Sequence, residues 1–326
     1  MTQRVLVCIV AFNSKQYWAE LRAALEAQTY REFRTIVVDN ASRAEERLFS
    51  DDLPPCTELL QLEENIGFAK ANNLAAQSSD AEFFVTLNPD AFPAPDWLER
   101  LVAAADATPQ AAAFGSLQIS ALEPQKLDGA GDEYWLGGLP NRSLYNRPRE
   151  RDPGPGAVFS ACAAAALYRG KVFRDMGGFD EDFFCYCEDV DLGFRLRLRG
   201  YDILQAPGAI VRHVGGGAAG ARSSFAVFHG TRNRLWTFMH NMPGAWFYAL
   251  APLHAAMTLF VLAWSLFRGT AGPTWRGVAA GLRSWRHVWR KRRLTQRART
   301  APDLAVIGAM MISPLAVLRR APKRGG

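Results

Sequence analysis

The stretch RVLVCIVAFN, residues 4–13, is an apolar run that ends in an asparagine, Asn13. Its length and its content of Val and Ile predict a buried β-strand. Residues 14–28 follow directly and repeat apolar side chains at helical spacing, which predicts a helix. A strand followed by a helix is the unit from which parallel sheets are built.

Three more strands follow in the next eighty residues. They are predicted at residues 33–42, 57–65 and 82–91, and a helix entered through Gly67 is predicted at residues 66–78. This alternation predicts an α/β fold with a mostly parallel sheet flanked by helices. Ligands of such sheets bind beyond the carboxyl ends of the strands. We therefore expect a ligand site at the polar residues that end these strands: Asn13, Asp39, Asn65 and Asp90.

Length and cysteine content narrow the class of protein. The chain of 326 residues has room for one large α/β domain and an appendage. Its five cysteines lack disulfide or zinc spacing and predict free thiols in a reduced compartment. No G-x-G-x-x-G follows the first strand, so a nicotinamide or flavin cofactor loses its main support. The N-terminal apolar run lacks the charged region and cleavage site of a signal peptide, so we expect a cytoplasmic location.

Positive charge is concentrated in the C-terminal third. Residues 213–326 contain 17 Lys and Arg and one acid, Asp303, which gives a net charge of +16. Residues 1–212 contain 21 basic and 31 acidic residues, which gives −10. A concentration of basic charge attracts phosphate, either of nucleic acid or of anionic lipid.

The apolar segments of this region favour lipid. Residues 246–267 contain no charged residue, and this length can cross a hydrocarbon core or lie in its interface. Residues 275–299 predict one amphipathic helix, and residues 304–318 form a second apolar run. The helix carries large apolar side chains on one face and Arg or Lys on the other; the apolar ones are Trp275, Leu282, Trp285 and Trp289.

We therefore predict that residues 241–326 form a helical, basic region that associates with an anionic membrane surface. Two alternatives remain for this region: a helical subdomain with a solvated basic face, and a nucleic-acid-binding region. The apolar runs would have no role in nucleic-acid binding, so no nucleic-acid partner is expected.

The segment FDEDFFCYCEDVDLGFRLRLRG, residues 179–200, places six carboxylates among aromatic residues and cysteines. Acids in the first turn of a helix and arginines in the last suit the helix dipole, and this alone explains Glu188, Asp189 and Asp191 structurally. It does not explain the aromatic residues beside them, which would dehydrate the carboxylates and raise their pKa: Phe183, Phe184 and Tyr186. We therefore interpret the segment as the floor of a catalytic site, with acids for chemistry and aromatic rings for desolvation and for stacking against a ligand.

Six segments, in this order, carry a resemblance to family 2 glycosyltransferases of the GT-A fold: VAFN, VVDNAS, NIGFAKANN, LNPDA, the acidic segment and RHVGG. The likeness is greatest to the bacterial rhamnosyltransferase-like branch, which builds O-antigen and other cell-surface glycans. It covers residues 4–240. It implies a catalytic domain of residues 1–240, with a nucleotide-sugar half at about 1–110 and an acceptor half at about 111–240.

The resemblance also implies an activity. The chain would be an inverting hexosyltransferase that uses a nucleotide-diphosphate sugar, usually with Mg²⁺ or Mn²⁺. Its acceptor would be a lipid-linked saccharide at the cytoplasmic face of the cell membrane. Rhamnose from dTDP-rhamnose is the leading donor, and other dTDP- or UDP-linked sugars remain open.

Catalytic and metal-binding residues follow by correspondence with the family. The general base would be Asp189, with Glu188 and Asp191 as supporting or acceptor-binding groups. The family's DXD motif is Asn88-Pro89-Asp90 here, so Asp90 would bind the metal, together with His213. An ordinary turn at residues 88–90 and a structural His213 are the alternatives.

Donor-binding residues follow in the same way. Asp39 corresponds to the residue that binds the nucleobase, and its carboxylate could accept from N3–H of uracil or thymine; a strand-end cap is the alternative. Asn13, Asn65 and Asn73 belong to the same expected donor site. Gly67 would open the loop so that the backbone approaches the ligand closely.

Two other functions are alternatives to a sugar transferase of this kind. A processive synthase would carry a Gln-x-x-Arg-Trp motif and several membrane spans, but the nearest sequence here is RNRLW, residues 232–236. A catalytically inactive, sugar-nucleotide-binding scaffold at the membrane is favoured only by Asn88, and the intact Glu188-Asp189 pair weighs against it.

Overall fold

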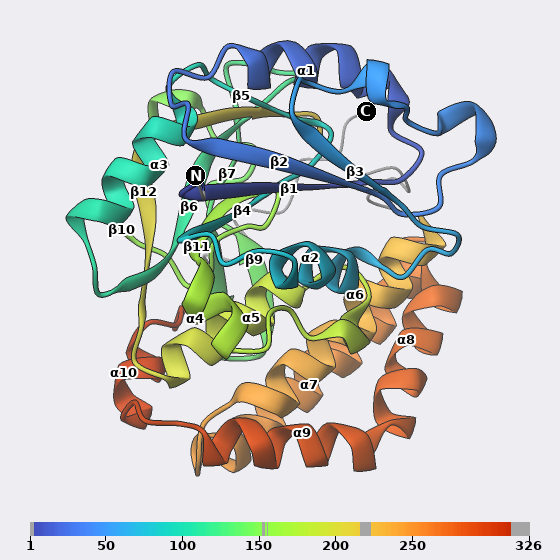
Figure 1. Cartoon of the computed structure of the whole chain (residues 1–326). Coiled ribbons are helices and arrows are strands. Elements are labelled where there is room, and N and C mark those ends of the chain that lie inside the picture. Colours follow the sequence, from blue (N-terminus) through green and yellow to red (C-terminus); the bar gives the residue numbers. More distant parts are fainter. Residues whose placement is uncertain (1–2, 152–153, 155, 216–222, 314–326) are drawn as a thin grey trace.

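The computed structural model describes residues 3–151, 154, 156–215 and 223–313 (Figure 1). Four strands form the first half of the sheet: β1 (Val5–Ala11), β2 (Phe33–Asp39), β3 (Thr57–Gln61) and β4 (Phe83–Leu87). They lie in the order β4-β1-β2-β3, and each neighbouring pair is parallel. The strands predicted at these positions and their parallel pairing are confirmed.

The second half makes the sheet mixed. Strand β11 (Ala165–Arg169) lies antiparallel between β4 and β6 (Ala111–Ser120), and β12 (Asp202–His213) pairs parallel with β6. Shorter strands extend its edges: β5 (Ala91–Pro93), β7 (Leu127–Ala130) and β10 (Gly156–Ala157). A separate hairpin is formed by β8 (Asp132–Trp135) and β9 (Leu139–Arg142).

Helices cover both faces of the sheet (Figure 1). One face packs against α1 (Trp18–Glu26) and α3 (Trp97–Ala107). The other packs against α2 (Phe68–Gln77), α4 (Gly170–Asp175) and α5 (Glu188–Leu198). Alternate side chains of β1 enter the two cores, Val7 and Ile9 on one side and Leu6 and Cys8 on the other. Because both faces are buried, the strand is apolar throughout, as its sequence predicts.

The C-terminal helices pack on one another. They are α6 (Ser224–Asn241), α7 (Trp246–Phe267), α8 (Ala271–Arg283), α9 (Trp285–Arg297) and α10 (Asp303–Gly308). Two of them, α6 and α10, also contact α5. Lys291 of α9 forms ion pairs with Asp180 and Asp182 of the acidic segment. These contacts join the basic region to the segment that precedes α5.

The single amphipathic helix predicted at residues 275–299 is wrong, because the chain turns at Ser284 and α9 runs across the ends of α7 and α8 (Figure 1). The turn lets Val288 pack against Phe183 and Trp236. It also brings the Arg292 guanidinium to the carbonyl oxygens at the end of α6. The apolar run predicted at residues 304–318 contains the short helix α10, and residues 314–318 lie outside the described residues.

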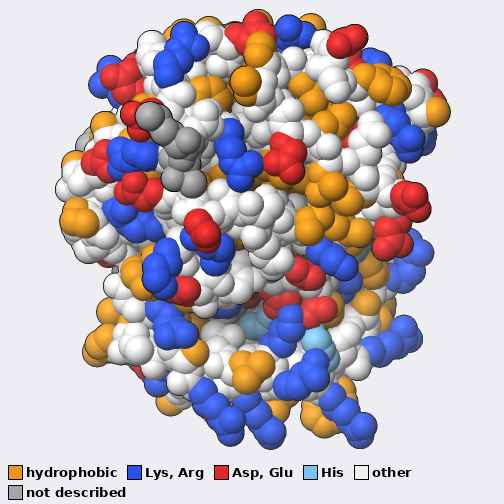
Figure 2. Space-filling view, viewed as in Figure 1, with side chains coloured by type: hydrophobic (Ala, Val, Ile, Leu, Met, Phe, Trp, Pro, Cys, Tyr) orange, Lys and Arg blue, Asp and Glu red, His pale blue; other side chains and the backbone are white. Residues whose placement is uncertain are grey.

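Helix α7 exposes apolar side chains and buries polar side chains against the rest of the protein. His254, Thr258 and Ser265 are buried, whereas Leu266 is 61% and Phe267 78% exposed. Among the described residues, α7 alone has the length and apolar composition that could cross a membrane. Figure 2 shows Lys and Arg side chains along the lower edge of the molecule, with apolar side chains between them.

Candidate active site

A cavity of about 1200 Å³ opens at the carboxyl ends of β1, β4 and β12. Its wall is completed by the β7–β9 segment and by the starts of α5 and α6. Predicted site residues from four separate parts of the chain line it: Asn65, Asn88, Asp90, Glu188, Asp189 and His213. The prediction that a ligand site lies beyond the ends of the strands agrees with this geometry.

Asp90 and His213 meet at one end of the cavity. His213 ends β12, which pairs with β5 so that His213 lies opposite Ala91, the residue after Asp90. His213 Nε2 lies 3.3 Å from Asp90 Oδ1 without hydrogen-bond geometry, and it has no hydrogen-bond partner among the described residues. Its other nitrogen, Nδ1, lies 2.7 Å from Asp128 Oδ2.

A carboxylate on one imidazole nitrogen commonly orients the other nitrogen toward a metal. Burial opposes protonation of His213, but its contacts with Asp128 and Asp90 outweigh burial and raise its pKa. Burial also opposes ionisation of Asp128, but His213 and Arg142 outweigh it and lower the pKa of this carboxyl. Asp128 is therefore an anion that can hold the ring in position, and the donor set suits Mg²⁺ or Mn²⁺.

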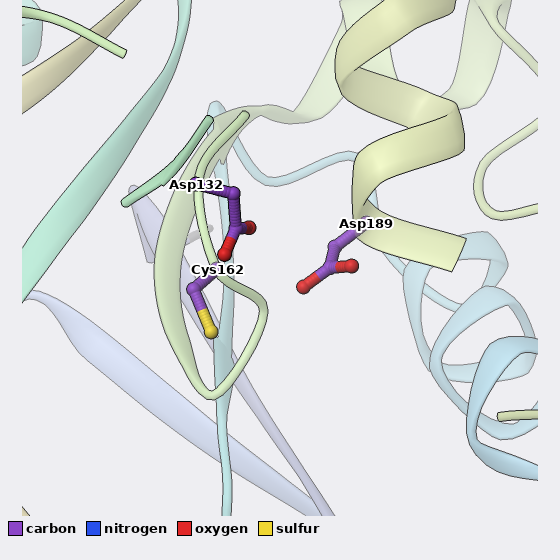
Figure 3. Close-up of side chains that lie close together, drawn as sticks. All are labelled: Asp132, Cys162 and Asp189. Carbon is purple, nitrogen blue, oxygen red and sulfur yellow. The ribbon is translucent and has the colours of Figure 1, made fainter. Parts of the chain in front are cut away.

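A second group of acids lies further along the cavity (Figure 3). Asp189 points from the first turn of α5 toward Asp132 and Cys162, and the three side chains bring ligand atoms within 4.8 Å of one another. Asp189 Oδ2 accepts a hydrogen bond from the Ala163 N–H, and Asp132 Oδ2 accepts one from the Ser160 hydroxyl. These bonds fix both carboxyl groups.

Burial raises the pKa of each acid in this group. Burial and the charge of Asp189 raise the pKa of Asp132 to about 8. Burial also raises the pKa of Glu188 well above its usual value, and Asp189 adds to that effect. For Asp189 burial again raises the pKa, although N–H donors from Ala163 and Val190 and the charge of Arg142 oppose it. The backbone N–H donors thus favour the ionised form of Asp189, whereas Asp132, with a pKa of about 8, is protonated at pH 7.

The donor set of this group suits proton exchange better than metal binding. Burial raises the pKa of the Cys162 thiol to about 12, so the thiol is protonated and a poor ligand. A guanidinium nitrogen of Arg142 lies 3.6 Å from Cys162 Sγ, and Arg142 also pairs with Asp128 at 2.5 Å. A positive charge is therefore already present between the two groups of acids.

The loop before α5 has a strained backbone. Phe184, Tyr186 and Cys187 have φ values of 64°, 71° and 65°, in the left-handed region that side chains disfavour. Asn233 of α6 holds the loop, because its side-chain amide donates to three carbonyl oxygens between residues 183 and 186. Strain of this kind persists where the surrounding structure imposes it, often at a functional site.

The aromatic residues of this loop separate into two roles. Phe184 and Tyr186 line the cavity, as the interpretation of the acidic segment requires. Phe183 is fully buried against Trp236 and does not. The proposed role of Phe183 in stacking against a ligand is therefore wrong.

Four of the six acids in the segment also have structural partners. Asp180 and Asp182 pair with Lys291, and Glu181 accepts from the side-chain amide of Asn73. Asp191 is 1% exposed and does not line the cavity. Its carboxylate accepts from Arg195 Nε at 2.7 Å and from Asn241 Nδ2 at 2.7 Å.

The structure thus contradicts the placement of Asp191 in the catalytic group. Burial would raise the pKa of Asp191, but Arg195, His240 and Asn241 outweigh it and hold this pKa well below its usual range. In the helical turn that begins α5, residues 188 and 189 face the cavity and residue 191 faces α6.

The donor-site residues near β2 differ from expectation too. Asp39 is 1% exposed, and its two carboxylate oxygens accept from the N–H groups of Ser42 and Leu48. It does not line the cavity, so the structure supports the strand-end alternative. Asn13 also lies outside the lining; its Oδ1 accepts from the Arg43 N–H and holds the same loop.

Asn65 does line the cavity. Its Oδ1 accepts from Asn40 Nδ2 and from the Gly67 N–H. Asn40 lines the cavity as well. The residue after Asp39 therefore lies at the cavity wall, where Asp39 itself was expected.

Gly67 and Asn73 are structural. A Cβ on Gly67 would lie 2.6 Å from Phe184 Cδ2, and the glycine has a φ of +85°. The close approach that requires this glycine is to Phe184, and Gly67 does not line the cavity. Asn73 is buried in α2 and exchanges two hydrogen bonds with the backbone of Phe179.

Residues that the sequence interpretation missed supply much of the cavity wall. They are Asn40, Asp128, Asp132, Arg142, Cys162 and Arg234. The only available signal was LDGAGDEYW, residues 127–135, where acids alternate with glycines and aromatic residues as in the segment before α5.

Comparison with known proteins places this geometry in a family. The family model described as glycosyl transferase family 2 matches residues 6–177. A Mycobacterium tuberculosis protein, N-acetylglucosaminyl-diphospho-decaprenol L-rhamnosyltransferase, is 28% identical over 235 residues, which cover 65% of this chain and 76% of that protein. The O-antigen biosynthesis protein RfbC of Myxococcus xanthus is 28% identical over 193 residues, 56% of this chain and 15% of that protein.

Two solved structures share the fold. A mannosyltransferase from Pyrobaculum calidifontis, in complex with GDP-Man and Mn²⁺, superposes with a TM-score of 0.55 at 18% identity, covering 95% of this chain and 87% of that one. GalNAc-T7, solved with UDP, GalNAc and Mn²⁺, gives a TM-score of 0.56 at 16% identity, covering 71% and 47%. The GT-A fold expected from the sequence is thereby confirmed.

Proposed function

The chain belongs to glycosyl transferase family 2 and is a glycosyltransferase, and from this premise we propose a reaction for it. The enzyme transfers rhamnose from dTDP-rhamnose, with inversion, to a hydroxyl of a lipid-linked saccharide in cell-surface polysaccharide synthesis. The rhamnosyltransferase name and the diphospho-decaprenol acceptor of the Mycobacterium tuberculosis relative support this donor and acceptor class. The geometry that carries the proposal is the single cavity shared by Asp90, His213 and Asp189.

Asp90 and His213 suit a divalent cation. Their facing atoms are 3.3 Å apart, and a buried imidazole nitrogen without a hydrogen-bond partner among the described residues is what a metal site needs. A bound Mg²⁺ or Mn²⁺ would neutralise charge on the leaving diphosphate. Asn88, in the first position of the family's DXD motif, lines the cavity beside them and offers an amide in place of a carboxylate.

Asp189 is positioned to act as the general base. Hydrogen bonds from two backbone N–H groups hold its carboxylate toward the cavity, and its raised pKa makes it a stronger base than an ordinary aspartate. It would accept the proton of the acceptor hydroxyl as that oxygen attacks the anomeric carbon. The new C–O bond forms opposite the departing diphosphate, so the configuration at the anomeric carbon inverts.

Glu188 has a supporting role in this scheme. Its carboxyl is buried and one of its oxygens has no hydrogen-bond partner among the described residues. Burial raises its pKa well above the usual value, and in its protonated form it can donate a hydrogen bond to an acceptor hydroxyl without repelling Asp189.

The position of α7 supports a membrane-bound acceptor. The buried face of α7 is tied to the cavity wall through His254, which contacts the carbonyl oxygen of Gly137, and through Thr258, which accepts from Arg234. A helix that spanned the bilayer would carry Arg234 to its centre, which is costly. We therefore propose that α7 lies in the interface at the cytoplasmic face, with its apolar side in lipid and the basic residues of α9 near anionic headgroups.

A screen of the purified protein against nucleotide sugars tests this proposal. The panel contains dTDP-rhamnose, UDP-glucose, UDP-N-acetylglucosamine and GDP-mannose, each with Mn²⁺ and with EDTA. We expect release of dTDP from dTDP-rhamnose that requires Mn²⁺. Binding of a donor without turnover, with a lipid-linked acceptor present, would instead support the inactive scaffold that Asn88 favours.

A further inference from the structure

Arg234 is a buried cation in the cavity wall. It lies on α6, its side chain is 5% exposed, and it faces the same cavity as Asp189. Its Nη2 donates to the Thr258 hydroxyl of α7 at 2.9 Å. Its Nε and Nη1 have no hydrogen-bond partner among the described residues.

Other buried or partly buried arginines of this protein are satisfied by partners. Arg142 pairs with Asp128, Arg195 pairs with Asp191, and Arg292 donates to two backbone carbonyl oxygens. Around Arg234 the groups that favour its charge are the weak acids Tyr134 and Cys187, and burial lowers its pKa despite them. His254 also lies close; burial and the charge of Arg234 lower the pKa of this imidazole to about 4, so it is neutral at pH 7.

A buried guanidinium without an anion is unfavourable, so a protein retains one where a ligand supplies the anion. The planar fork of arginine matches phosphate oxygens, which accept two parallel hydrogen bonds. Nη2 carries two N–H groups, and the one that does not donate to Thr258 can form such a fork with the unpartnered Nε or Nη1 of Arg234. The anion that completes the site is therefore a phosphate group of a substrate.

We propose that Arg234 binds the diphosphate of the lipid-linked acceptor. The inference rests on the proposed function, because both substrates of that reaction carry a diphosphate. The contacts of Arg234 favour the acceptor diphosphate over the donor diphosphate. Its hydrogen bond goes to α7, the helix proposed to lie in the membrane interface. Its neighbours are Tyr134 of β8 and Cys187, which directly precedes α5. His213, which is proposed with Asp90 to face the donor diphosphate, contacts Asp90 and Asp128 instead.

This placement defines the orientation of the acceptor in the cavity. The saccharide of the acceptor would extend from Arg234 toward Asp189, and its lipid would leave along α7. Thr258, which orients the guanidinium, would make the position of α7 part of the acceptor site.

Binding measurements on the full chain test the proposal with soluble probes of three kinds. Farnesyl diphosphate represents an isoprenoid diphosphate, farnesol is its phosphate-free counterpart, and UDP or dTDP, each with Mn²⁺, represents the donor. The variants are Arg234→Met, Arg234→Lys and Thr258→Val. Arg276→Met removes an exposed charge from the neighbouring helix α8 and serves as the charge-matched control.

We expect Arg234→Met to weaken farnesyl diphosphate binding at least tenfold, with farnesol and UDP binding unchanged. Arg234→Lys should lose less, Thr258→Val should lose part of the affinity, and Arg276→Met should bind as the wild type does. The thermal midpoint of Arg234→Met without ligand should equal or exceed that of the wild type, because an uncompensated buried charge has been removed.

Several results would overturn the assignment. Unchanged farnesyl diphosphate affinity in Arg234→Met would make the residue structural, and a lower thermal midpoint with unchanged affinity would do the same. Loss of UDP affinity alone would move the residue to the donor site. Wild-type protein that binds UDP or dTDP but does not prefer farnesyl diphosphate to farnesol would refute this inference alone, whereas a protein that binds neither UDP nor dTDP would refute the proposed function.

Discussion

Replacing Asp132 by asparagine should stabilise the folded protein, and only above about pH 4. In the folded state burial and Asp189 raise the pKa of Asp132 to about 8, whereas an unfolded chain has an aspartate pKa of about 3.9. Between these values the folded protein binds more protons than the unfolded chain. Its free energy of unfolding therefore falls as the pH rises, by about 1.4 kcal/mol per pH unit, until it levels off near pH 8.

At pH 7 this cost amounts to about 2–4 kcal/mol, the lower value applying if the neighbouring carboxyl groups share the proton. Asparagine has no proton to lose, and its side-chain oxygen can still accept from the Ser160 hydroxyl, as Asp132 does at 3.1 Å. The variant should therefore match the wild type at pH 4 and become progressively more stable relative to it up to pH 8.

Urea denaturation at one-unit steps from pH 4 to pH 8 measures this difference. Asp128→Asn is the matched control of opposite sign, because the pKa of Asp128 is lowered in the folded state. Asp128 contributes stability that is present above its unfolded pKa and is lost as the pH falls, so its variant should be less stable at pH 7. If the stability difference between Asp132→Asn and the wild type does not change with pH, Asp132 is not protonated in the folded protein and the description of the acidic group is wrong.

Three further predictions concern the metal pair, the membrane face and the loop glycine. Asp128→Asn should weaken Mn²⁺ affinity about 10–100-fold by releasing the orientation of His213, measured by titration with Mn²⁺; unchanged affinity would separate Asp128 from the metal site. Replacing Leu259 and Phe267 by serine should reduce sedimentation with anionic liposomes at low salt while leaving donor hydrolysis intact; full retention on liposomes would contradict the placement of α7. Gly67→Ala should lower the free energy of unfolding by about 1–3 kcal/mol because of its positive φ and the contact with Phe184, and equal stability in urea would contradict that reading.

The sheet was predictable because its evidence is local. The run from Val5 to Ala11 is apolar throughout, the run from Phe83 to Leu87 is apolar except for Thr86, and both become central strands. Asn65 and Asp90 were predicted to lie in the site because each ends a predicted strand, and both line the cavity. The antiparallel insertion of β11 was not predictable, because strand order depends on pairing between segments about eighty residues apart.

The direction of each carboxylate was the part that the sequence could not give. Asp39 ends β2 as expected, but the loop that follows covers it. The N–H groups of Ser42 and Leu48 in this loop donate to both carboxylate oxygens of Asp39. Asp191 lies two residues after Asp189, yet the turn of the helix directs it to Arg195 and Asn241. Asp180 forms an ion pair with Lys291, more than a hundred residues later in the chain.

The break at Ser284 has the same origin. The spacing of Trp275, Leu282 and Trp285 is compatible with one continuous helix, and no proline or glycine interrupts the chain between residues 282 and 299. The turn is set by what α9 gains elsewhere, through the burial of Val288 and the hydrogen bonds of Arg292. Local propensity does not contain that information.

The most direct test of the account is sugar transfer by Asp189→Asn. With radiolabelled dTDP-rhamnose, Mn²⁺ and a membrane-held lipid-linked acceptor, the variant should bind donor as the wild type does but transfer about 10²–10⁴-fold more slowly, the usual range for the loss of a general base. Substantial transfer by Asp189→Asn, with donor binding intact, would contradict the assignment of Asp189 as the base.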